Sequence, residues 1–442
     1  MPTADEIVIV GGGIGGLAAA LGLHAGGRPV RVFESATEIR ALGVGINLLP
    51  HAVRELDALR LADEVLAAAV APETLSYFTK HGALIWSEAR GRTAGYHWPQ
   101  ISVHRGTLQS VLFDAVIARL GADRMHCGHH LTALEQSDDG VRLRFRDRLT
   151  DHDVTFDAAG VVGADGIHSV VRQTLVVDEG RPIWNGAVLW RGLVDHERIL
   201  DGRTMIWAGH RQQKFVAYPI RDLPDGRQQV NFIAELRRPN DPFAEREDWN
   251  RPGNLDDFAP EFASWTFPWL DVPAMLAASP GTFVFPMVDR DPLPSWSDRR
   301  ITLLGDAAHP MYPIGSNGAS QAILDGRVLA ACLRQYSDPS EAFARYESVR
   351  RPATSAIVIA NRGLGPEMPM QLVEERAPNG FTNIADVIAP EEIAAVTDGY
   401  RRTAGFALAA LADPTSLADR NYEHPPSGVD RQSEGGGVAI GY

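Results

Sequence analysis

The sequence is poor in lysine and cysteine, and both scarcities narrow its chemistry. Its 442 residues include two lysines, Lys80 and Lys214, and two cysteines, Cys127 and Cys332. Neither lysine lies in a recognisable motif, which leaves few candidates for Schiff-base catalysis. The cysteines are far apart and outside any spacing typical of metal ligands, so we expect no disulfide framework and no metal site. The same scarcity is typical of a reducing, cytoplasmic location.

Basic tracts and long apolar runs are also missing. The formal net charge is -14 and the basic residues form no cluster, so we expect no nucleic-acid partner. No apolar stretch reaches the ~18 residues of a membrane span, and "MPTADE" has no basic signal region, so we expect no membrane association. The hydrophobic share of 45% is enough for a large core. At about 150 residues per domain, the length predicts two or three domains.

Glycine is plentiful near the N-terminus. In "EIVIVGGGIGGLAAALGLHAGG", an apolar β-branched run leads into Gly11, Gly13 and Gly16, and a helical pattern follows. This spacing between strand and helix is typical of a dinucleotide-binding turn: the first glycine permits the turn, the second admits a pyrophosphate, and the third packs helix on strand. Glu34 ends the next strand, where a carboxylate can bind a ribose. A glycine-rich turn without a ligand is the alternative, which the strand, helix and acid together disfavour.

Three later stretches favour FAD over NAD as the bound dinucleotide. "SVHRGTLQSVLFDAV" puts Arg105 at the start of an amphipathic helix, a poor place for a cation unless a phosphate lies near. A solvated arginine is the alternative. "AAGVVGADGIHSVVRQTL" puts Asp165 and Gly166 directly after an apolar strand, although Asp165 could instead cap the helix that follows.

The third such stretch is "RITLLGDAAHPMYPIGSNGASQ". It places Asp306 at the C-terminal tip of a strand, where ligands bind in open α/β sheets and a carboxylate can accept a hydrogen bond from a ribityl hydroxyl. Gly315 and Gly318 permit tight turns, so we predict that a flavin ring lies against the backbone here. The helix that opens after Asn317 would direct N–H groups at the negative charge of a reduced flavin.

Taken together, these motifs resemble those of the class A flavoprotein aromatic hydroxylases, of the p-hydroxybenzoate hydroxylase fold. They occur in the family's order between residues 7 and 320. The stretches "EIRALGVGINLLPHAV", "WSEARG", "SVHRGTLQ" and "FPMVDRDPLPSW" are most similar to the phenazine-modifying branch of that family. The loop "PIGSNG" departs from the "PxxGQG" form of the wider family. The resemblance fades after Arg351 and Pro352.

The resemblance implies an α/β fold in which two domains are interleaved. A Rossmann-like FAD-binding domain of the GR2 type would comprise residues 1–73, 103–182 and 284–360. A mostly antiparallel β-sheet substrate domain would comprise residues 74–102 and 183–283. Residues 361–420 would form a helical C-terminal region, and the composition of residues 421–442 predicts a disordered tail.

The resemblance also implies a set of FAD-binding residues. Those at the pyrophosphate would be Gly11, Gly13, Ile14, Gly15 and Gly16; those at the adenosine would be Glu34, Ser35 and Leu131. The loop with Arg40, Val44 and Gly45 would lie near the flavin and its swinging path, and Arg105 near the FAD phosphate or ribityl chain. Asp165 would serve both FAD and NAD(P)H, and Asp306 the ribityl chain. The isoalloxazine would contact Gly315, Ser316, Asn317, Gly318 and Ala319.

The run of strands between residues 184 and 236 predicts an antiparallel sheet that covers the flavin. Candidate pocket residues are Trp190, Arg191, Trp207, Tyr218, Pro219 and Phe232, although each aromatic could equally belong to the core. Arg191 is a charge in an apolar strand and needs a partner, so we expect it to meet a substrate or reacting oxygen. With Tyr218 and Pro313 it forms the candidate catalytic set. We expect His309 to be a hydrogen-bonded loop residue rather than an acid or base.

The activity that the resemblance implies is that of an FAD-dependent, NAD(P)H-consuming monooxygenase. It would hydroxylate a small aromatic substrate with dioxygen through a flavin C4a-hydroperoxide, the cofactor carrying the chemistry. A phenazine or phenazine carboxylate, with or without decarboxylation, is the substrate class implied. NADH and NADPH both remain open, as do a monomer and a homodimer. The alternatives are a flavin oxidase or dehydrogenase on the same fold and a non-catalytic escort protein.

Overall fold

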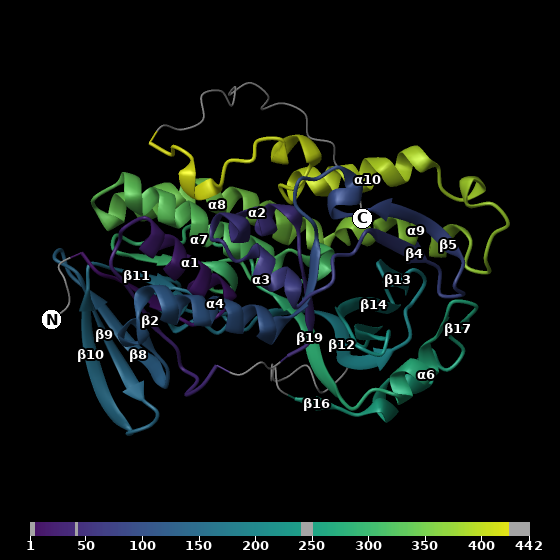
Figure 1. Ribbon diagram of the computed structural model, residues 1–442, viewed down its shortest axis with the longest axis horizontal. Helices are drawn as coiled ribbons and strands as arrows, with labels where there is room; N and C mark the ends of the chain where they lie inside the picture. Colours follow the sequence, from purple (N-terminus) through teal and green to yellow (C-terminus); the bar gives the residue numbers. More distant parts are fainter. Residues whose placement is uncertain (1–4, 40–42, 240–250, 424–442) are drawn as a thin grey trace.

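The computed structural model describes residues 5–39, 43–239 and 251–423. Its two main sheets lie toward opposite ends of the long axis of the molecule (Figure 1). The first is parallel, in the order β20-β11-β1-β2-β7. Its strands are β1 (Ile7–Val10), β2 (Val30–Phe33), β7 (Met125–His126), β11 (Gly160–Gly163) and β20 (Ile301–Leu303). Every residue of β1, β11 and β20 is buried, as expected of a parallel sheet covered on both faces.

Helices pack closely on this parallel sheet and on one another. They are α1 (Ile14–Ala25), α2 (Pro50–Ala58), α3 (Ala62–Ala67), α4 (Arg105–Leu120), α5 (Val170–Leu175), α7 (Gly318–Gln335) and α8 (Pro339–Arg362). Small residues let α1 and α7 approach, since a Cβ at Gly326 would lie 2.8 Å from the Ala19 nitrogen. An antiparallel sheet of β8 (His129–Gln136), β9 (Val141–Asp147) and β10 (His152–Ala158) lies beside them. A short pair joins β3 (Gly45–Leu48) and β6 (Ile101–His104).

The second main sheet has eight strands, in the order β16-β19-β12-β15-β14-β13-β4-β5. They are β4 (Thr74–Phe78), β5 (Leu84–Ala89), β12 (Ile183–His196), β13 (Thr204–His210), β14 (Gln213–Asp222), β15 (Gln228–Arg237), β16 (Pro252–Gly253) and β19 (Thr282–Asp289). All neighbours are antiparallel except β4 and β13. The predicted α/β fold with a mostly antiparallel sheet is thus confirmed. The predicted domain boundary between residues 283 and 284, however, falls inside β19.

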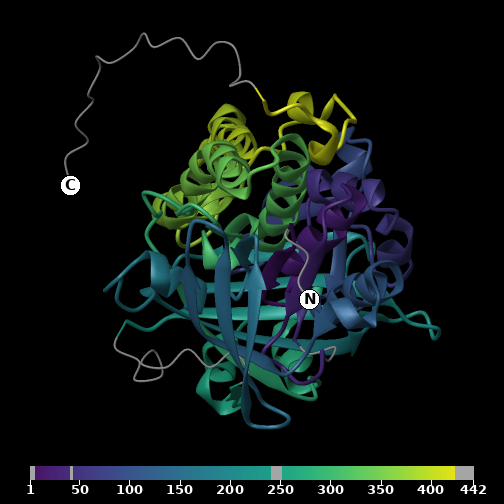
Figure 2. The ribbon, with the colours of Figure 1, turned by 90° about the vertical axis from the view of Figure 1, so that its left-hand side faces the viewer.

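Both faces of the eight-stranded sheet are covered, each by different elements. One face packs on α6 (Val272–Ala277) and the aromatic residues Phe258 and Phe262; the other packs on the C-terminal helices. Figures 1 and 2 both show the sheet between these layers, with the C-terminal helices at the top. Because side chains alternate along a strand, Phe215 belongs to the α6 side and Val216 to the other.

The C-terminal region is helical, as predicted. It contains a 3-10 turn at Gly365–Glu367, α9 (Met368–Arg376) and α10 (Pro390–Thr403), and shorter turns follow. The first residues of the predicted disordered tail are ordered, because Tyr422 is buried and its backbone nitrogen donates to Gln335 Oε1 at 2.7 Å. Residues 424–442 lie outside the described residues.

Within residues 5–39, 43–239 and 251–423, no helix is both long and apolar enough to span a membrane. No group of three or more His, Cys, Asp or Glu side chains in those ranges could hold a metal ion.

Candidate active site

The glycines of the first turn have different surroundings. A Cβ added at Gly11, whose φ is +114°, would lie 2.3 Å from the Ala164 carbonyl oxygen, and one at Gly16 would lie 2.0 Å from the Gly11 carbonyl oxygen. These two glycines therefore serve the turn and the packing, as predicted. No described atom lies within 4 Å of a Cβ at Gly13, which precedes α1. Gly13 thus faces open space at a helix N-terminus, which suits a pyrophosphate.

The turn is held by side chains on both sides of the Gly12 peptide. Glu34 Oε2 accepts from the Gly12 nitrogen at 2.7 Å, and Gln109 Nε2 donates to the Gly12 carbonyl oxygen at 2.8 Å. Glu34 Oε1 accepts from the Ala36 nitrogen at 2.7 Å and from Ser35 Oγ at 3.2 Å. Both oxygens of Glu34 thus bind the protein, and its role at the ribose stays a prediction. Gln109 ends "SVHRGTLQ", one of the stretches that carried the resemblance, but nothing in that stretch assigned it a role.

Asp165 caps α5. Its Oδ2 accepts from the Val170 nitrogen at 2.7 Å, and its Oδ1 accepts from Ser169 Oγ. Burial raises the pKa of Asp165, and these hydrogen bonds oppose the rise. The structure therefore shows the capping alternative, and a direct contact with FAD or NAD(P)H stays a prediction. Arg172, on α5, donates to the carbonyl oxygens of Ala307 and Ala308 at 2.9 and 3.0 Å, so this motif supports the loop after β20.

Asp306 and Arg105 lie within electrostatic range of each other. Asp306 follows β20, and its side chain is exposed. The positive charge of Arg105 acts on the Asp306 carboxylate and favours its ionised form. Arg105 is exposed at the first position of α4, and its nitrogen donates to the Val44 carbonyl oxygen at 3.0 Å. Leu131 differs, because its side chain is buried in the core; β8, which carries it, is an edge strand.

The loop from residue 313 to 319 needs its two glycines for different reasons. At Gly315, with φ +69°, a Cβ would lie 2.1 Å from Tyr400 Oη. The side of Gly315 on which a Cβ would lie is thus filled by α10, and a contact of its backbone with a flavin stays a prediction. At Gly318, the first residue of α7, no described atom lies within 4 Å of an added Cβ. The space that a flavin could approach is thus at Gly318 and the N-terminus of α7.

Tyr400 also binds the side chain of Asn317 in this loop. Asn317 is fully buried and its Nδ2 donates to Tyr400 Oη at 2.7 Å, and that hydroxyl is 2.7 Å from Asn361 Oδ1. The Asn317 side chain therefore binds the C-terminal region, so a contact with the isoalloxazine would need its backbone. Pro313 is exposed, and Ser316 and Ala319 are half-buried. The catalytic role of Pro313 and the contacts of Ser316 and Ala319 with the isoalloxazine stay predictions.

Arg191 has a different partner from the one expected. Its Nη2 donates to the Gly45 carbonyl oxygen at 2.6 Å, and its guanidinium lies 5.7 Å from the centre of the Phe285 ring. Tyr218 Oη donates to the same carbonyl oxygen at 2.7 Å. Burial lowers the pKa of Arg191 and raises that of Tyr218. The guanidinium is thus held by the first residue of β3, but its buried Nε has no partner among the described residues, and a contact with the substrate stays a prediction. Arg40, in the loop before β3, lies outside the described residues.

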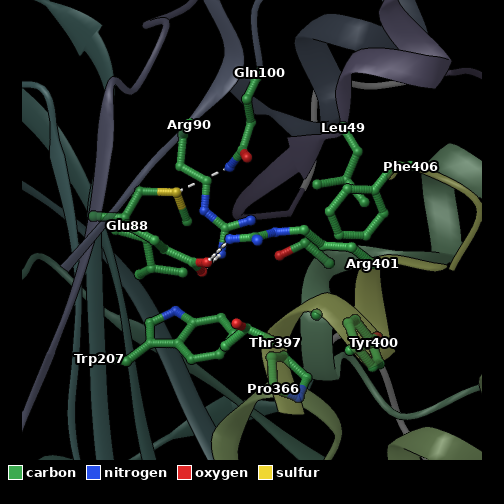
Figure 3. A pocket seen from close by; sticks show the side chains of 14 residues that line it. Leu49, Glu88, Arg90, Gln100, Trp207, Pro366, Thr397, Tyr400, Arg401 and Phe406 are labelled. Atoms are coloured by element: carbon green, nitrogen blue, oxygen red, sulfur yellow. Dashed lines mark hydrogen bonds and ion pairs between the residues drawn. The ribbon is translucent and has the colours of Figure 1, made fainter. Parts of the chain in front are cut away.

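A pocket between the eight-stranded sheet and α10 reaches the loop of residues 313–319, which we call the flavin loop (Figure 3). Its walls include Trp207, Phe406 and Leu49, and it borders Gly315 and Ser316. Trp207 therefore lies where the sequence predicted. Trp190 and Phe232 do not, because they lie in the core on the α6 side, where Trp190 stacks on Phe258 at 5.0 Å between ring centres.

Charged side chains in the pocket were not predicted. They are Glu88, Arg90 and Arg401. Glu88 and Arg90 belong to "WSEARG", one of the stretches that carried the resemblance, but nothing in it assigned them a role. Arg401 comes from α10, in the part of the chain to which no motif extended.

A second cavity, of about 200 Å³, lies where β12 and β15 face the end of α8. Tyr312 and Ile314 line it, so it borders the other side of the flavin loop. Near it Lys214 is buried and pairs with Glu235 at 2.8 Å and Glu367 at 2.6 Å. The two carboxylates raise the pKa of Lys214 against the effect of its burial, so it stays a cation at neutral pH.

Comparison with known proteins agrees with this geometry. The family model for the FAD binding domain matches residues 5–252. The chain belongs to that family, and its relatives are FAD-dependent aromatic hydroxylases. It is 44% identical over 404 residues to phenazine 1,6-dicarboxylic acid hydroxylase PhzS of Lysobacter antibioticus, covering 90% of this chain and 97% of the relative. It is 30% identical to 3-hydroxybenzoate 6-hydroxylase of Klebsiella oxytoca over 388 residues, 86% of this chain and 92% of that enzyme.

Solved structures show the same fold. HpxO of Klebsiella pneumoniae, complexed with FAD and uric acid, superposes with a TM-score of 0.71 at 22% identity, over 92% of this chain and 96% of that chain. A salicylate hydroxylase substrate complex superposes with a TM-score of 0.69 at 23% identity, over 90% of this chain and 97% of that chain. The predicted fold of the class A hydroxylases is thereby confirmed.

Proposed function

We propose that this FAD-dependent aromatic hydroxylase acts on a phenazine carboxylate, with NADH or NADPH and dioxygen as co-substrates. The observation that carries the proposal is the 44% identity, over 97% of the relative, to a hydroxylase of phenazine 1,6-dicarboxylic acid. The chain would work in the cytoplasm as a monomer or a homodimer.

The residues present fit FAD. Gly13 and Gly318 face open space, and each lies at the N-terminal end of a helix, where free N–H groups favour negative charge. Bound FAD would supply the redox chemistry, taking a hydride from NADH or NADPH and passing one atom of dioxygen to the ring, the other leaving as water. Gly13 would hold the pyrophosphate and Asp306 the ribityl chain.

The chain's own residues would contribute orientation and exclusion of water. Arg191 and Tyr218 hold the Gly45 carbonyl oxygen, so the first residue of β3 is fixed to the eight-stranded sheet. Tyr400 fixes the flavin loop from the other side. Trp207 and Phe406 would keep the ring of the substrate flat and screen it from water. No side chain here is required as a nucleophile.

The test is NADH and NADPH consumption by the FAD-loaded protein with phenazine-1-carboxylate, phenazine-1,6-dicarboxylate and 3-hydroxybenzoate. Under ¹⁸O₂ we expect a phenazine carboxylate to stimulate consumption and to gain one labelled oxygen atom, with any decarboxylation seen as released CO₂. An oxidised product without label, accompanied by hydrogen peroxide, would favour the oxidase alternative. Stimulation by 3-hydroxybenzoate alone would reject the phenazine assignment.

A further inference from the structure

We propose that Asn361 is a positioning residue for the flavin, because it fixes the flavin loop from the end of α8. The inference rests on the proposed function, in which the flavin lies at this loop, and it deepens that function by saying what sets the position of the ring. Asn361 is 1% exposed, so its side chain is shielded from any ligand and acts only through its neighbours. Those neighbours are the backbone beside the loop and Tyr400 of α10.

Asn361 contacts the loop region directly and through Tyr400. Its Nδ2 donates to the Tyr312 carbonyl oxygen at 3.0 Å, and its Oδ1 lies 2.7 Å from Tyr400 Oη. Tyr400 Oη is also 3.1 Å from the Ile314 carbonyl oxygen. These two carbonyl groups flank Pro313, so both contacts act on the start of the flavin loop.

The Tyr400 hydroxyl has one proton to donate and two acceptors within reach. Asn317 Nδ2 donates to this hydroxyl at 2.7 Å, so the proton of the hydroxyl goes to Asn361 Oδ1 or to the Ile314 carbonyl oxygen. The Asn361 oxygen is the nearer acceptor, so Asn361 orients the hydroxyl that holds Asn317. Within the described residues, no polar side-chain atom of Asn317, Asn361 or Tyr400 is buried without a partner. Loss of the amide or of the hydroxyl would therefore leave buried polar groups unpaired, which costs free energy.

The loop needs support from outside because its own backbone is weakly bonded. Gly315 and Ser316 have positive φ values of +69° and +59°, and this conformation is unfavourable for a residue with a side chain, such as serine. The Ser316 nitrogen donates to the Pro313 carbonyl oxygen at 3.3 Å, which is long for a hydrogen bond. Pro313 itself has no N–H group to donate. The contacts made by Asn361 and Tyr400 thus stabilise a backbone conformation that the loop does not favour by itself.

Asn361 is in turn fixed to the eight-stranded sheet. It is followed by Arg362, the last residue of α8, which donates to both oxygens of Asp289 of β19, from Nε at 2.7 Å and from Nη2 at 2.9 Å. A paired guanidinium–carboxylate contact of this kind is strong and has a defined geometry. Because β19 belongs to the eight-stranded sheet, Asn361 fixes the flavin loop relative to the sheet that we expect to cover the flavin.

The consequence for FAD concerns the N-terminus of α7. The loop leads directly into Gly318, the first residue of α7, where the described atoms leave space beside an added Cβ. A displaced loop would move the N–H groups of this helix end, and such groups act on a cofactor only when they are held within about 0.5 Å of the productive position. Asn361 would thereby set both the affinity for FAD and the position of the ring.

The experiment removes the two contacts one at a time and together. Asn361→Leu keeps the approximate size of the side chain without its hydrogen bonds, and Tyr400→Phe removes only the hydroxyl. FAD is titrated into the FAD-free proteins, and the visible absorption spectrum of the bound flavin is recorded at saturation. We expect each variant to raise the Kd of FAD by about tenfold or more and to shift the flavin bands in the same way. The double variant should stay well below the roughly hundredfold product of the single effects, because both residues act through the same hydroxyl.

Thr354→Val is the matched control. Thr354 lies on the same helix and is fully buried, and its Oγ1 donates to the Arg350 carbonyl oxygen at 3.1 Å within α8. This variant should lower the melting temperature of the FAD-free protein and leave the Kd of FAD and the flavin spectrum unchanged. A wild-type Kd and spectrum in Asn361→Leu, or an equal loss of affinity in Thr354→Val, would overturn the inference, because Asn361 would then only support the fold. Fully independent effects in the double variant would overturn it as well.

The outcome is separable from that of the substrate test. If Asn361→Leu and Tyr400→Phe weaken FAD binding as expected but no phenazine carboxylate gains label from ¹⁸O₂, the inference holds and the substrate assignment is rejected. If the wild type hydroxylates a phenazine carboxylate and Asn361→Leu binds FAD like the wild type, the inference is refuted and the proposed function holds. A wild type that binds no FAD would refute both.

Discussion

Arg191 and Tyr218 donate hydrogen bonds to one atom, the carbonyl oxygen of Gly45, at 2.6 and 2.7 Å. Arg191 lies on β12 and Tyr218 on β14, two strands of the eight-stranded sheet, whereas Gly45 begins β3, which is not part of that sheet. On the other side of the residue, the Gly45 nitrogen donates to Asn231 Oδ1 of β15 at 2.8 Å. Three strands of the eight-stranded sheet thus hold the first residue of β3, and we expect Arg191 to act as a positioning residue.

The first prediction concerns Arg191. Arg191→Ala should lower kcat by about tenfold or more while FAD stays bound, because the hydrogen bond to Gly45 carries charge and is worth about 1.5–3 kcal/mol. Arg191→Lys should recover part of the activity, since an ammonium group can donate to the same carbonyl. The measurements are the flavin absorbance per protein and kcat. Equal loss of FAD and activity, or loss of neither, would contradict this role.

Replacement of Gly45 itself should destabilise the fold. A Cβ there would lie 2.7 Å from Asn231 Cβ and 2.9 Å from Ile220 Cγ2, so Gly45→Ala should reduce the free energy of unfolding by about 1–3 kcal/mol. Gly281→Ala is the control, because no described atom lies within 4 Å of its added Cβ. Thermal unfolding of both variants gives the comparison, and equal melting temperatures would count against this packing.

Gly315 and Gly318 should respond in opposite ways. Gly315→Ala should lower the melting temperature even without FAD, because of its positive φ and the Tyr400 hydroxyl 2.1 Å from the added Cβ. Gly318→Ala should fold normally and lose FAD affinity, because its methyl group enters the space at the N-terminus of α7. FAD titration and thermal unfolding of the FAD-free variants separate the two effects. Full FAD affinity in Gly318→Ala would mean that the flavin lies elsewhere.

Asp306 provides a direct test of the cofactor site. Asp306→Ala should retain less FAD after dialysis, because its exposed carboxylate at the tip of β20 is the predicted partner of a ribityl hydroxyl. Asp138→Ala, on the exposed hairpin between β8 and β9, is the control. The flavin-to-protein ratio is the readout, and a ratio equal to that of the wild type would reject the assignment.

Acid should weaken the fold through Asp325. Burial alone would raise the pKa of this carboxyl, but His309 at 2.6 Å and Arg350 at 2.7 Å hold it at about 2, below its ordinary 3.8. A lowered pKa stabilises the fold above pH 3.8, and the contribution is lost as the pH falls from there toward 2. Asp325→Asn should therefore lose about 3–5 kcal/mol at neutral pH and show a weaker dependence in that range. Urea unfolding at several pH values measures it, and an unchanged pH dependence would contradict the prediction.

The fold was predictable from the sequence where the constraint is local. The turn after β1 needs its glycines for contacts with near neighbours, such as that of Gly16 with Gly11, and such spacing is visible in the chain. The parallel strands were visible for a related reason, because burial on both faces makes them continuously apolar. The same holds for Arg105, whose place at a helix start follows from the adjacent residues.

The substrate side was less predictable, for two physical reasons. Alternation along a strand separates Trp190 from Arg191, but both faces of this sheet are covered, so the pattern does not say which face borders the flavin. In addition, the pocket combines segments far apart in the chain. Glu88 and Arg401 meet only because α10 folds back over β5, and no local pattern encodes that contact.

Tyr400 and Arg401 are adjacent in the chain, yet one fixes the flavin loop and the other lines the substrate pocket. A chimaera in which α10 is exchanged between homologous hydroxylases would therefore transfer both properties as one module. Such an exchange should succeed only where the recipient has a glycine at the position of Gly315, because any other residue there would meet the incoming tyrosine. We therefore expect such a chimaera to change substrate range and FAD binding together.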